Sequence, residues 1–358
     1  MMKALKKSHI NIANTARLGL MKKPQLMNLY WESTHRCNLR CKHCFSDSGE
    51  GNASDELTTA EIKNELHKIA SRYNAKKIAF IATGGELLTR PDIFEVLTYA
   101  SGLGYRCEIT TNGTLIDEHI VQLIKQSGVE KIIISLDGNC ETHDRFRGVR
   151  GSFDRTLQGI RLLKDANFLK VLQVNTVYNK ENMGQLHEIY DIVLHSGATV
   201  WRIASVKPLG RANQNRDILL DGQDYRTLLD FIQTLRKNCG MEVTYEHSNF
   251  LGLDYEFEVR DKCFICQAGI ITAGILANGD VYGCLNIPRL PQLIQGNIRK
   301  RDFCDIWENE FELFRNENRT TCDRCQKCSS WKYCYGGPFH TWDFEQNKPN
   351  ICLEGISW

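Results

Sequence analysis

Three cysteines near the N-terminus lie on one short stretch of chain. Cys37, Cys41 and Cys44 have the spacing C-x3-C-x2-C and directly follow a run of residues typical of a β-strand. Thiolates at this spacing are ligands for a soft metal ion or an iron–sulfur cluster. A [4Fe–4S] cluster has four irons, so three cysteine ligands leave one iron free for a small chelating ligand. The alternative is a structural zinc site with His35 or His43 as the fourth ligand.

A second group of cysteines lies in the last third of the chain. Two spacings are present, C-x2-C-x17-C and C-x2-C-x2-C-x5-C-x17-C. The first set is Cys263, Cys266 and Cys284, and the second set is Cys322, Cys325, Cys328, Cys334 and Cys352. Zinc also binds C-x2-C pairs, so spacing alone leaves structural zinc and iron–sulfur ligation open here.

The composition is that of a soluble globular protein with many cysteines. The chain has 358 residues, of which 25% are charged, 42% are hydrophobic and 15 are cysteines. The net charge of +2 gives no general attraction to nucleic acid or to a membrane surface. We find no signal-peptide core and no run of the ~20 apolar residues that a membrane span needs. We therefore expect a cytoplasmic protein whose clustered cysteines bind metal and are not paired as disulfides.

Strand and helix patterns alternate between residues 28 and 238. We predict strands at residues 28–33, 77–83, 106–111, 131–136, 170–177 and 200–205, and helices at residues 59–72, 92–102, 117–126, 153–165, 183–195 and 224–237. Six such units indicate a parallel sheet with right-handed crossovers. Because a complete eight-unit barrel needs roughly 250 residues, we predict an α/β fold with a partial (β/α)6 TIM-like barrel. The first cysteine loop would lie at the edge of the barrel where active sites occur.

The two ends of the chain differ from this barrel. Residues 1–27 are basic and mildly amphipathic, and we interpret them as a leader segment that is solvated or forms a helix on the barrel. A surface for a partner protein is the alternative. Residues 239–358 are rich in cysteine, glycine and turn residues, which predicts a small loop-rich domain held together by metal.

Small and polar residues follow the ends of the second, third and fourth predicted strands: Gly84, Gly85, Glu86, Asn112, Ser135 and Asp137. Glycines allow the backbone to approach a ligand closely. Glu86 can accept charge-assisted hydrogen bonds from an ammonium group. The other three polar side chains can bind hydroxyls or a carboxylate. Together they predict a polar ligand beside the first cysteine loop.

The first cysteine motif, with Phe45 directly after its last cysteine, resembles the signature of the radical S-adenosylmethionine (SAM) superfamily. The run Thr83–Gly84–Gly85–Glu86 resembles its Gly-Gly-Glu motif, with Leu87 where the family usually has proline. The resemblance implies that the three cysteines hold a [4Fe–4S] cluster bound to SAM. It also implies that Phe45 and the six residues at the strand ends contact SAM. Such an enzyme reductively cleaves SAM to a 5′-deoxyadenosyl radical, which abstracts hydrogen from a substrate.

The C-terminal cysteines resemble those of the SPASM subgroup. Gly279 to Cys284 is similar to its G-x4-C element, and Cys325, Cys328 and Cys334 are similar to its C-x2-C-x5-C element. The resemblance implies one or two auxiliary iron–sulfur clusters. Their ligands would be Cys263, Cys266 and Cys284 for the first, and Cys325, Cys328, Cys334 and Cys352 for the second. The family's remaining ligand position holds Pro338, so the first cluster has an open iron, uses Cys322 or Cys304, or is smaller or absent.

The overall spacing resembles peptide-modifying enzymes of the mycofactocin-maturase and PQQ-synthesis type, including the run Lys207–Pro208–Leu209–Gly210–Arg211. This implies a ribosomally made precursor peptide that is cross-linked, decarboxylated or epimerised. Because 27 residues precede the first predicted strand, we expect a separate small protein to deliver the peptide. A flavodoxin- or ferredoxin-like protein would donate the electron.

Other functions remain open from the sequence. One enzymatic alternative is the tailoring of a haem-type tetrapyrrole side chain. Sulfatase maturation is disfavoured because Asn286 stands where that subfamily has a catalytic aspartate. The alternative from another class is a non-catalytic iron–sulfur or zinc protein.

Overall fold

Strands and helices alternate along the first two thirds of the computed structural model, which describes residues 2–49, 55–246, 248–316 and 322–353. The strands of this part are β1 (Asn28–Glu32), β2 (Ala79–Thr83), β3 (Arg106–Thr111), β4 (Val129–Ser135), β5 (Val171–Tyr178), β6 (Val200–Ser205) and β7 (Glu242–Tyr245). The helices are α1 (Met2–Lys22), α2 (Thr59–Arg72), α3 (Ile93–Gly102), α4 (Glu118–Gln126), α5 (Cys140–Arg147), α6 (Ser152–Ala166), α7 (Leu186–Ser196) and α8 (Gly222–Leu235). The six predicted strand–helix units are confirmed.

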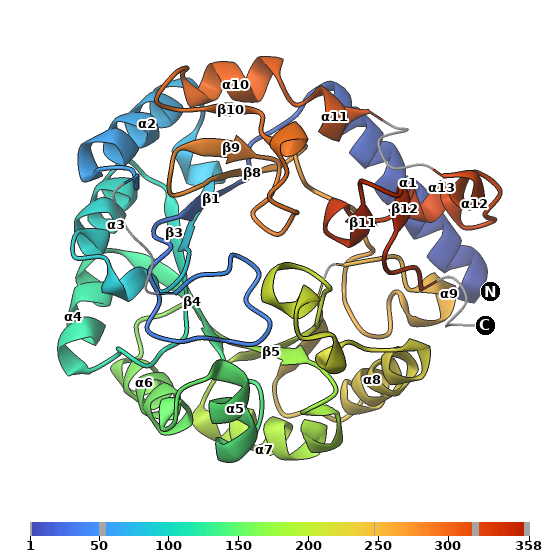
Figure 1. Ribbon diagram of the computed structural model, residues 1–358, viewed down its shortest axis with the longest axis horizontal. Coiled ribbons are helices and arrows are strands. Elements are labelled where there is room, and N and C mark those ends of the chain that lie inside the picture. The colour runs from blue at the N-terminus through green and yellow to red at the C-terminus, as the bar shows by residue number, and fades with distance from the viewer. Residues whose placement is uncertain (1, 50–54, 247, 317–321, 354–358) are drawn as a thin grey trace.

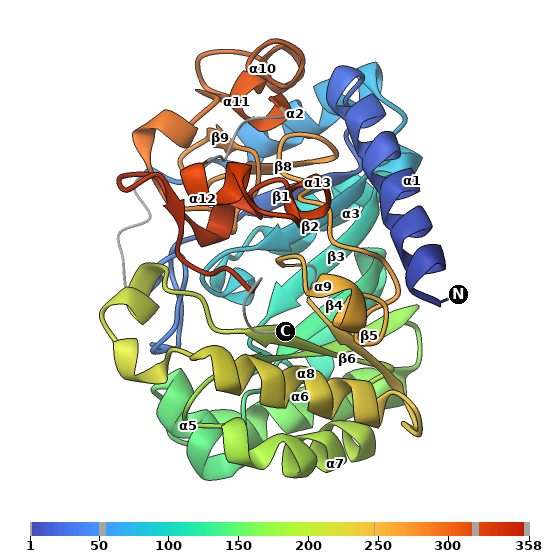
Figure 2. The same cartoon turned by 90° about the vertical axis from the view of Figure 1, so that its right-hand side faces the viewer.

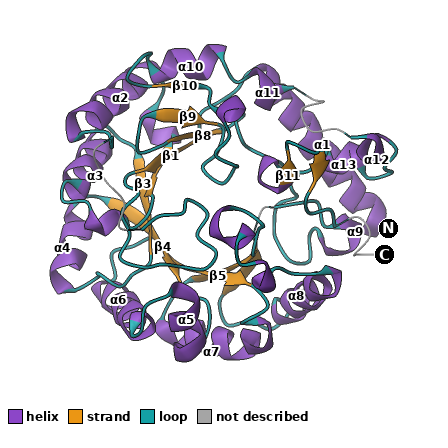
Figure 3. Cartoon of the chain, in the orientation of Figure 1, coloured by secondary structure: helices purple, strands orange, loops and turns teal. Residues whose placement is uncertain are grey.

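The strands form one curved sheet with helices around its outside (Figures 1 and 3). Its order is β10-β9-β8-β1-β2-β3-β4-β5-β6-β7, and the strands from β1 to β7 are parallel. The sheet therefore extends beyond the six predicted strands. β7 was missed because it has four residues, and β8 (Thr272–Ile275) pairs in parallel with β1 although it lies far away in sequence.

The remaining elements are short and lie in the last third of the chain. The strands are β9 (Asp280–Tyr282), β10 (Gly296–Asn297), β11 (Trp342–Asp343) and β12 (Lys348–Pro349). The helices are α9 (Gly252–Tyr255), α10 (Phe303–Asn309), α11 (Glu312–Arg315), α12 (Asp323–Gln326) and α13 (Trp331–Cys334). This part is loop-rich and follows the barrel, as the sequence predicts.

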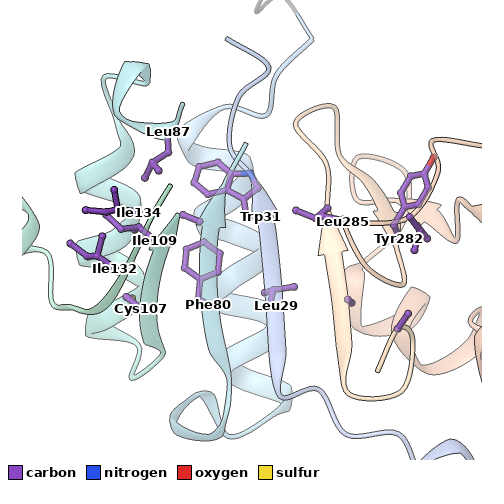
Figure 4. Packing of buried hydrophobic residues seen from close by; sticks show 14 of the residues in the cluster. Leu29, Trp31, Phe80, Leu87, Cys107, Ile109, Ile132, Ile134, Tyr282 and Leu285 are labelled. Carbon is purple, nitrogen blue, oxygen red and sulfur yellow. The ribbon is translucent and has the colours of Figure 1, made fainter. Parts of the chain in front are cut away.

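Alternating side chains on each barrel strand face opposite sides of the sheet. Leu29 and Trp31 on β1, and Phe80 on β2, are fully buried in the packing that Figure 4 shows. The intervening Tyr30 and Ile81 face the inside of the barrel, where they line a cavity. The outer face of each strand therefore supplies the core, and the inner face is free to carry polar groups.

The helices predicted at residues 59–72 and 92–102 are present. The side chain of Thr58 accepts a hydrogen bond from Glu61 N, and Glu61 bonds back to Thr58 N, so α2 begins with a capping box. Asp92 precedes α3 but makes no capping bond with its side chain. It pairs instead with Arg90, at 2.7 Å between Nε and Oδ1. Local sequence thus places α2 and α3 against the strands that hold the cysteine loop.

The N-terminal segment forms the long helix α1, which lies along the side of the molecule (Figure 2). Asn14 Nδ2 donates a hydrogen bond to Lys332 O at 3.0 Å, and the Arg17 guanidinium lies 3.8 Å from the ring centroid of Tyr335. The segment therefore packs on the cysteine-rich part of the chain. No helix among the described residues is long and apolar enough to cross a membrane.

Candidate active site

The loop that carries the first three cysteines packs tightly on the end of β2. An ideal Cβ on Gly84 would lie 2.5 Å from Thr34 O, and one on Gly85 would lie 2.1 Å from Arg36 O. Gly84 also has a φ of +139°, which side chains rarely adopt. Both predicted glycines are therefore needed for the close approach of the cysteine loop. Their contact with SAM stays a prediction.

The segment after β6 also contacts this loop, and this contact was not predicted from the sequence. Arg211 Nε donates to Cys41 O at 2.8 Å, and Arg211 Nη1 donates to Ser48 O at 2.8 Å. A Cβ on Gly210 would lie 2.3 Å from Cys44 O. Gly210 and Arg211 thus hold the cysteine loop from the opposite side of the barrel. The run from Lys207 to Arg211 was noted in the sequence and was the signal for this contact.

The three thiols fit the ligand set of an iron–sulfur cluster. Leu39 N donates to Cys37 Sγ at 3.4 Å, and Cys44 Sγ lies 3.7 Å from Ser46 Oγ. Burial, together with the nearby Cys41 and Cys44, raises the pKa of Cys37 to about 11. Thiolates crowded in this way repel one another, and positively charged irons remove that repulsion. The loop is therefore suited to a cluster with one iron left open.

Arg147, at the end of α5, brings a positive charge to the same loop. Its Nη1 donates to Cys41 Sγ at 3.5 Å, and its Nε donates to Asp137 Oδ2 at 2.6 Å. Val177 N donates to the other carboxylate oxygen of Asp137 at 2.7 Å. Burial alone would raise the pKa of Asp137, but the positive charge of Arg147 lowers it below its usual value. The structure thus gives Asp137 the role of positioning Arg147, and a direct contact of Asp137 with SAM stays a prediction.

Glu86 and Asn112 lie together at the ends of β2 and β3. The Glu86 carboxylate is fully buried and accepts hydrogen bonds from Thr111 Oγ1 at 2.7 Å and from Asn112 N at 2.8 Å. Burial raises the pKa of Glu86. Asn112 Nδ2 donates to Asn38 Oδ1 at 2.8 Å, which ties β3 to the cysteine loop. The structure brings these predicted residues together, and their contact with SAM stays a prediction.

Phe45 and Ser135 lie at two further points around the loop. Phe45 lines the space inside the barrel, and the Arg289 guanidinium lies 5.6 Å from its ring centroid. Arg289 in turn pairs with the buried Glu32 at 2.5 Å. Ser135 ends β4 and is half-buried. The contacts of Phe45 and Ser135 with SAM stay predictions.

The inside of the barrel contains a charged cavity that sequence reasoning missed. We call it the central cavity; it is lined by inward residues of the strands, by His43 and Phe45, and by residues 264–268, 284, 286–287 and 338–340. Lys131 Nζ lies 3.5 Å from Glu108 Oε2, and Lys207 Nζ lies 2.6 Å from Glu246 Oε1. The signal was a charged residue in the middle of several strands, at positions that alternate with buried apolar ones.

Arg202 differs from these paired cations. It projects from β6 into the central cavity, and its guanidinium makes no hydrogen bond or ion pair with any residue that the structure describes. Burial and Cys284 raise the pKa of the nearby Tyr30 to about 12, while Arg202 acts against this rise. The cavity therefore holds one cation that is ready to receive an anionic group.

Four cysteines of the second C-terminal set lie together in the structure. Cys325, Cys328, Cys334 and Cys352 line one pocket between α12, α13 and the last described residues. Burial and the other three cysteines raise the pKa of Cys334 to about 12. Cys322 lies beside Cys325 and forms a hydrogen bond with it. These residues fit an auxiliary cluster.

The first set of C-terminal cysteines, Cys263, Cys266 and Cys284, lies near the inner wall of the barrel. Cys266 and Cys284 line the central cavity, and Pro338 lines it too. Cys263 and Cys266 line a groove beside α1. Cys304 lies elsewhere, on α10, which packs on α2, and it is buried. The structure thus gives no support to Cys304 as a substitute ligand.

Among the residues that the structure describes, no three His, Cys, Asp or Glu side chains lie close enough together to bind a single metal ion.

Comparison with known proteins identifies the family. The model for the radical SAM superfamily matches residues 31–193, and the model for the SPASM iron–sulfur cluster-binding domain matches residues 266–329. An AdoMet-dependent heme synthase of Methanosarcina barkeri is 32% identical over 325 residues, which cover 86% of this chain and 89% of that protein. The chain belongs to the radical SAM superfamily. Its cofactors are a [4Fe–4S] cluster, SAM and auxiliary iron–sulfur clusters.

Two further comparisons place this radical SAM enzyme among its relatives. The mycofactocin maturase MftC of Mycolicibacterium smegmatis is 29% identical over 314 residues, covering 86% of this chain and 77% of that protein. The solved structure of native anSMEcpe with bound AdoMet matches with a TM-score of 0.71 at 21% identity and covers 92% of both chains. The structural match shows the shared fold.

Proposed function

We propose that this radical SAM enzyme removes a carboxylate from a side chain of a tetrapyrrole bound in the central cavity. The observation that carries the proposal is the unpaired guanidinium of Arg202 inside the barrel. A half-buried cation with no counter-charge favours an anionic ligand. Arginine binds carboxylates through two parallel hydrogen bonds, which fixes their position as well as their charge.

The walls of the central cavity suit a large apolar ring. Its apolar lining residues include Phe45, Ile81, Val206, Leu209, Phe264, Ile287 and Phe339. A tetrapyrrole has a planar apolar ring with carboxylates on its periphery, so its ring matches these apolar residues and its carboxylates match Arg202. The similarity to an enzyme that makes haem with AdoMet supports the same substrate class.

The chemistry divides between the cofactors and the chain. When bound, the clusters supply one-electron chemistry, namely cleavage of SAM to a 5′-deoxyadenosyl radical and acceptance of the electron that the substrate releases. The chain holds the first cluster through Cys37, Cys41 and Cys44, positions the side chain through Arg202, and excludes water from the barrel. A propionate that loses one hydrogen atom, carbon dioxide and one electron becomes a vinyl group, so atoms and electrons balance.

The second candidate substrate is a ribosomally made precursor peptide. The similarity to a mycofactocin maturase favours it, and a peptide carboxylate could also bind Arg202. In that case we propose that a separate small recognition protein delivers the peptide. For either substrate we propose a cytoplasmic enzyme that receives its electron from a flavodoxin- or ferredoxin-like donor.

The test compares the two substrates with one enzyme preparation. Anaerobically reconstituted protein is reduced and given SAM with iron coproporphyrin III, and the products are analysed by mass spectrometry. We expect 5′-deoxyadenosine and a porphyrin in which a propionic acid side chain has lost carbon dioxide and two hydrogens. Porphyrin turnover should fall at least about tenfold in Arg202→Ala. Arg161→Ala, on the exposed face of α6, is the control.

Two results would decide against the tetrapyrrole. An unchanged porphyrin, with 5′-deoxyadenosine still formed, contradicts the proposal. Modification of a precursor peptide by the same preparation would establish the second candidate.

A further inference from the structure

A histidine beside the central cavity has no assigned role. His340 lies in the short helical turn Phe339–Thr341, two residues after Pro338, and its imidazole lines the central cavity. Neither ring nitrogen forms a hydrogen bond or ion pair with a residue in the described part of the chain. A half-buried imidazole without a partner is available to a ligand in the cavity.

The backbone around His340 is held firmly. Phe339 is fully buried, and its ring centroid lies 4.5 Å from that of Phe314. Thr341 Oγ1 donates to Asn249 Oδ1 at 3.2 Å. The imidazole is therefore presented by a rigid turn, which limits the entropy lost when it binds a ligand.

The surroundings keep this imidazole neutral. Burial and the neighbouring Lys207 lower the pKa of His340 to about 4, while Glu246 acts in the opposite direction. Lys207 is itself saturated, because its Nζ contacts Ser205 Oγ at 2.5 Å, Glu246 Oε1 at 2.6 Å and Ser248 Oγ at 3.1 Å. A neutral imidazole is a metal ligand, whereas an imidazolium is not.

His340 and Arg202 lie at different depths of the same cavity. Arg202 is in the first half of β6, and Ser205, next to Lys207 and its neighbour His340, ends that strand. Arg202 and Ser205 are three positions apart in β6, which places their Cα atoms about 10 Å apart. A ligand that contacts both His340 and Arg202 must therefore extend along the cavity.

We propose that the imidazole of His340 is an axial ligand to the iron of an iron tetrapyrrole substrate while Arg202 holds one of its carboxylates. The inference rests on the proposed function, because it requires a tetrapyrrole in the central cavity. Histidine is a common protein ligand of haem iron. The bond fixes the height and tilt of the ring, and the contact of Arg202 with a carboxylate fixes its rotation about the iron–nitrogen bond, so the two contacts together determine which side chain faces the cysteine loop.

The test separates iron ligation from binding of the ring. Reconstituted enzyme labelled with 15N-histidine is titrated with ferric coproporphyrin III and, separately, with metal-free coproporphyrin III, and the coupling of a histidine nitrogen to the ferric iron is recorded by pulsed electron paramagnetic resonance. Wild type should bind both and show this nitrogen coupling signal with the iron form. In His340→Ala the signal should disappear and the iron form should bind at least about tenfold more weakly. The metal-free form should bind with unchanged affinity.

Controls keep the result specific. His340→Gln preserves the size of the side chain and should behave like His340→Ala, so a folding defect of one variant does not decide the outcome. Added 15N-imidazole should restore the nitrogen coupling in His340→Ala. His187→Ala, on the exposed outer side of α7, should behave as wild type.

The outcomes distinguish the two hypotheses. If wild type binds neither porphyrin, the proposed function and this inference both fail. If it binds both porphyrins but the histidine nitrogen coupling is absent or survives in His340→Ala and His340→Gln, the inference alone is wrong.

Discussion

Arg147 donates a hydrogen bond to the sulfur of Cys41, at 3.5 Å from Nη1 to Sγ. The guanidinium is buried and is held on its other side by Asp137. A positive charge is thus fixed against one ligand of the cluster that cleaves SAM.

Removing this charge should lower the reduction potential of the first cluster. In Arg147→Met the reduced state loses a favourable interaction with a unit charge, which at ~5 Å and an effective dielectric of about 20 is on the order of 100 mV. The measurement is a redox titration followed by electron paramagnetic resonance. Arg145→Met, on the same helix but far more exposed, is the control. Equal potentials in Arg147→Met and wild type would contradict the assigned role.

The fit between the cysteine loop and β2 makes Gly85 intolerant of a side chain. Gly85→Ala places a Cβ against Arg36 O, backbone against backbone, so we expect a loss of at least about 3 kcal/mol in the free energy of unfolding. Iron bound at the first site should fall with it. Gly184→Ala, with no atom within 4 Å of the new Cβ, should change neither. Thermal unfolding and iron analysis check both. A stable, fully loaded Gly85→Ala protein would refute the prediction.

The iron content of alanine variants should distinguish cysteines that bind an auxiliary cluster from cysteines that do not. Cys334→Ala removes a residue of the four-cysteine pocket, and iron should fall from roughly twelve to roughly eight per chain. Cys304 is buried on α10 outside the cysteine groups, so Cys304→Ala should keep its iron and lose about 1 kcal/mol of stability. A loss of iron in Cys304→Ala would show that Cys304 is a cluster ligand.

The Lys207–Glu246 pair gives the stability a specific pH dependence. Burial opposes ionisation, but Lys207 lowers the pKa of Glu246 from 4.5 to about 2. Its folded pKa lies below its unfolded pKa, so the pair stabilises the fold above pH 4.5, and this contribution is lost as the pH falls toward 2. At pH 7 Glu246→Gln should lose about 3 kcal/mol because it leaves Lys207 buried and unpaired.

Unfolding curves of wild type and Glu246→Gln at several pH values test this. The difference between the two proteins should be constant from pH 7 to pH 5 and should shrink below that. His340, whose pKa is lowered to about 4, titrates in both proteins and largely cancels in the comparison. If the difference in the free energy of unfolding stays the same down to pH 3, the Lys207–Glu246 pair does not cause the pH dependence.

Local patterns explain why the barrel was predicted from the sequence. The run from Thr58 to Glu61 marks the start of α2 through a capping box, and period-two and helical patterns place the six strands and their helices. The cysteine loop was found because its three thiols are close in sequence. These features depend on residues a few positions apart, so a single sequence contains them.

Features that depend on distant residues could not be predicted. The pairing of β8 with β1 joins Thr272 to Asn28, and nothing local indicates it. Asp137 was recognised, but its partner Arg147 follows ten residues later on a helix that has only eight residues. The inward position of Arg202 could not be predicted, because a charged residue within a strand can equally lie at the exposed edge of a sheet.

The position of β8 determines how independent the auxiliary-cluster region can be. Because β8 pairs with β1, the strand that carries the first cysteine loop has a neighbour on each side, β2 and β8. Deletion of the C-terminal third would expose a hydrogen-bonding edge beside the catalytic loop. We therefore expect the two iron–sulfur regions to fold as one cooperative unit, and exchanging the C-terminal region alone between relatives should yield insoluble chimaeras unless β1 is exchanged with it.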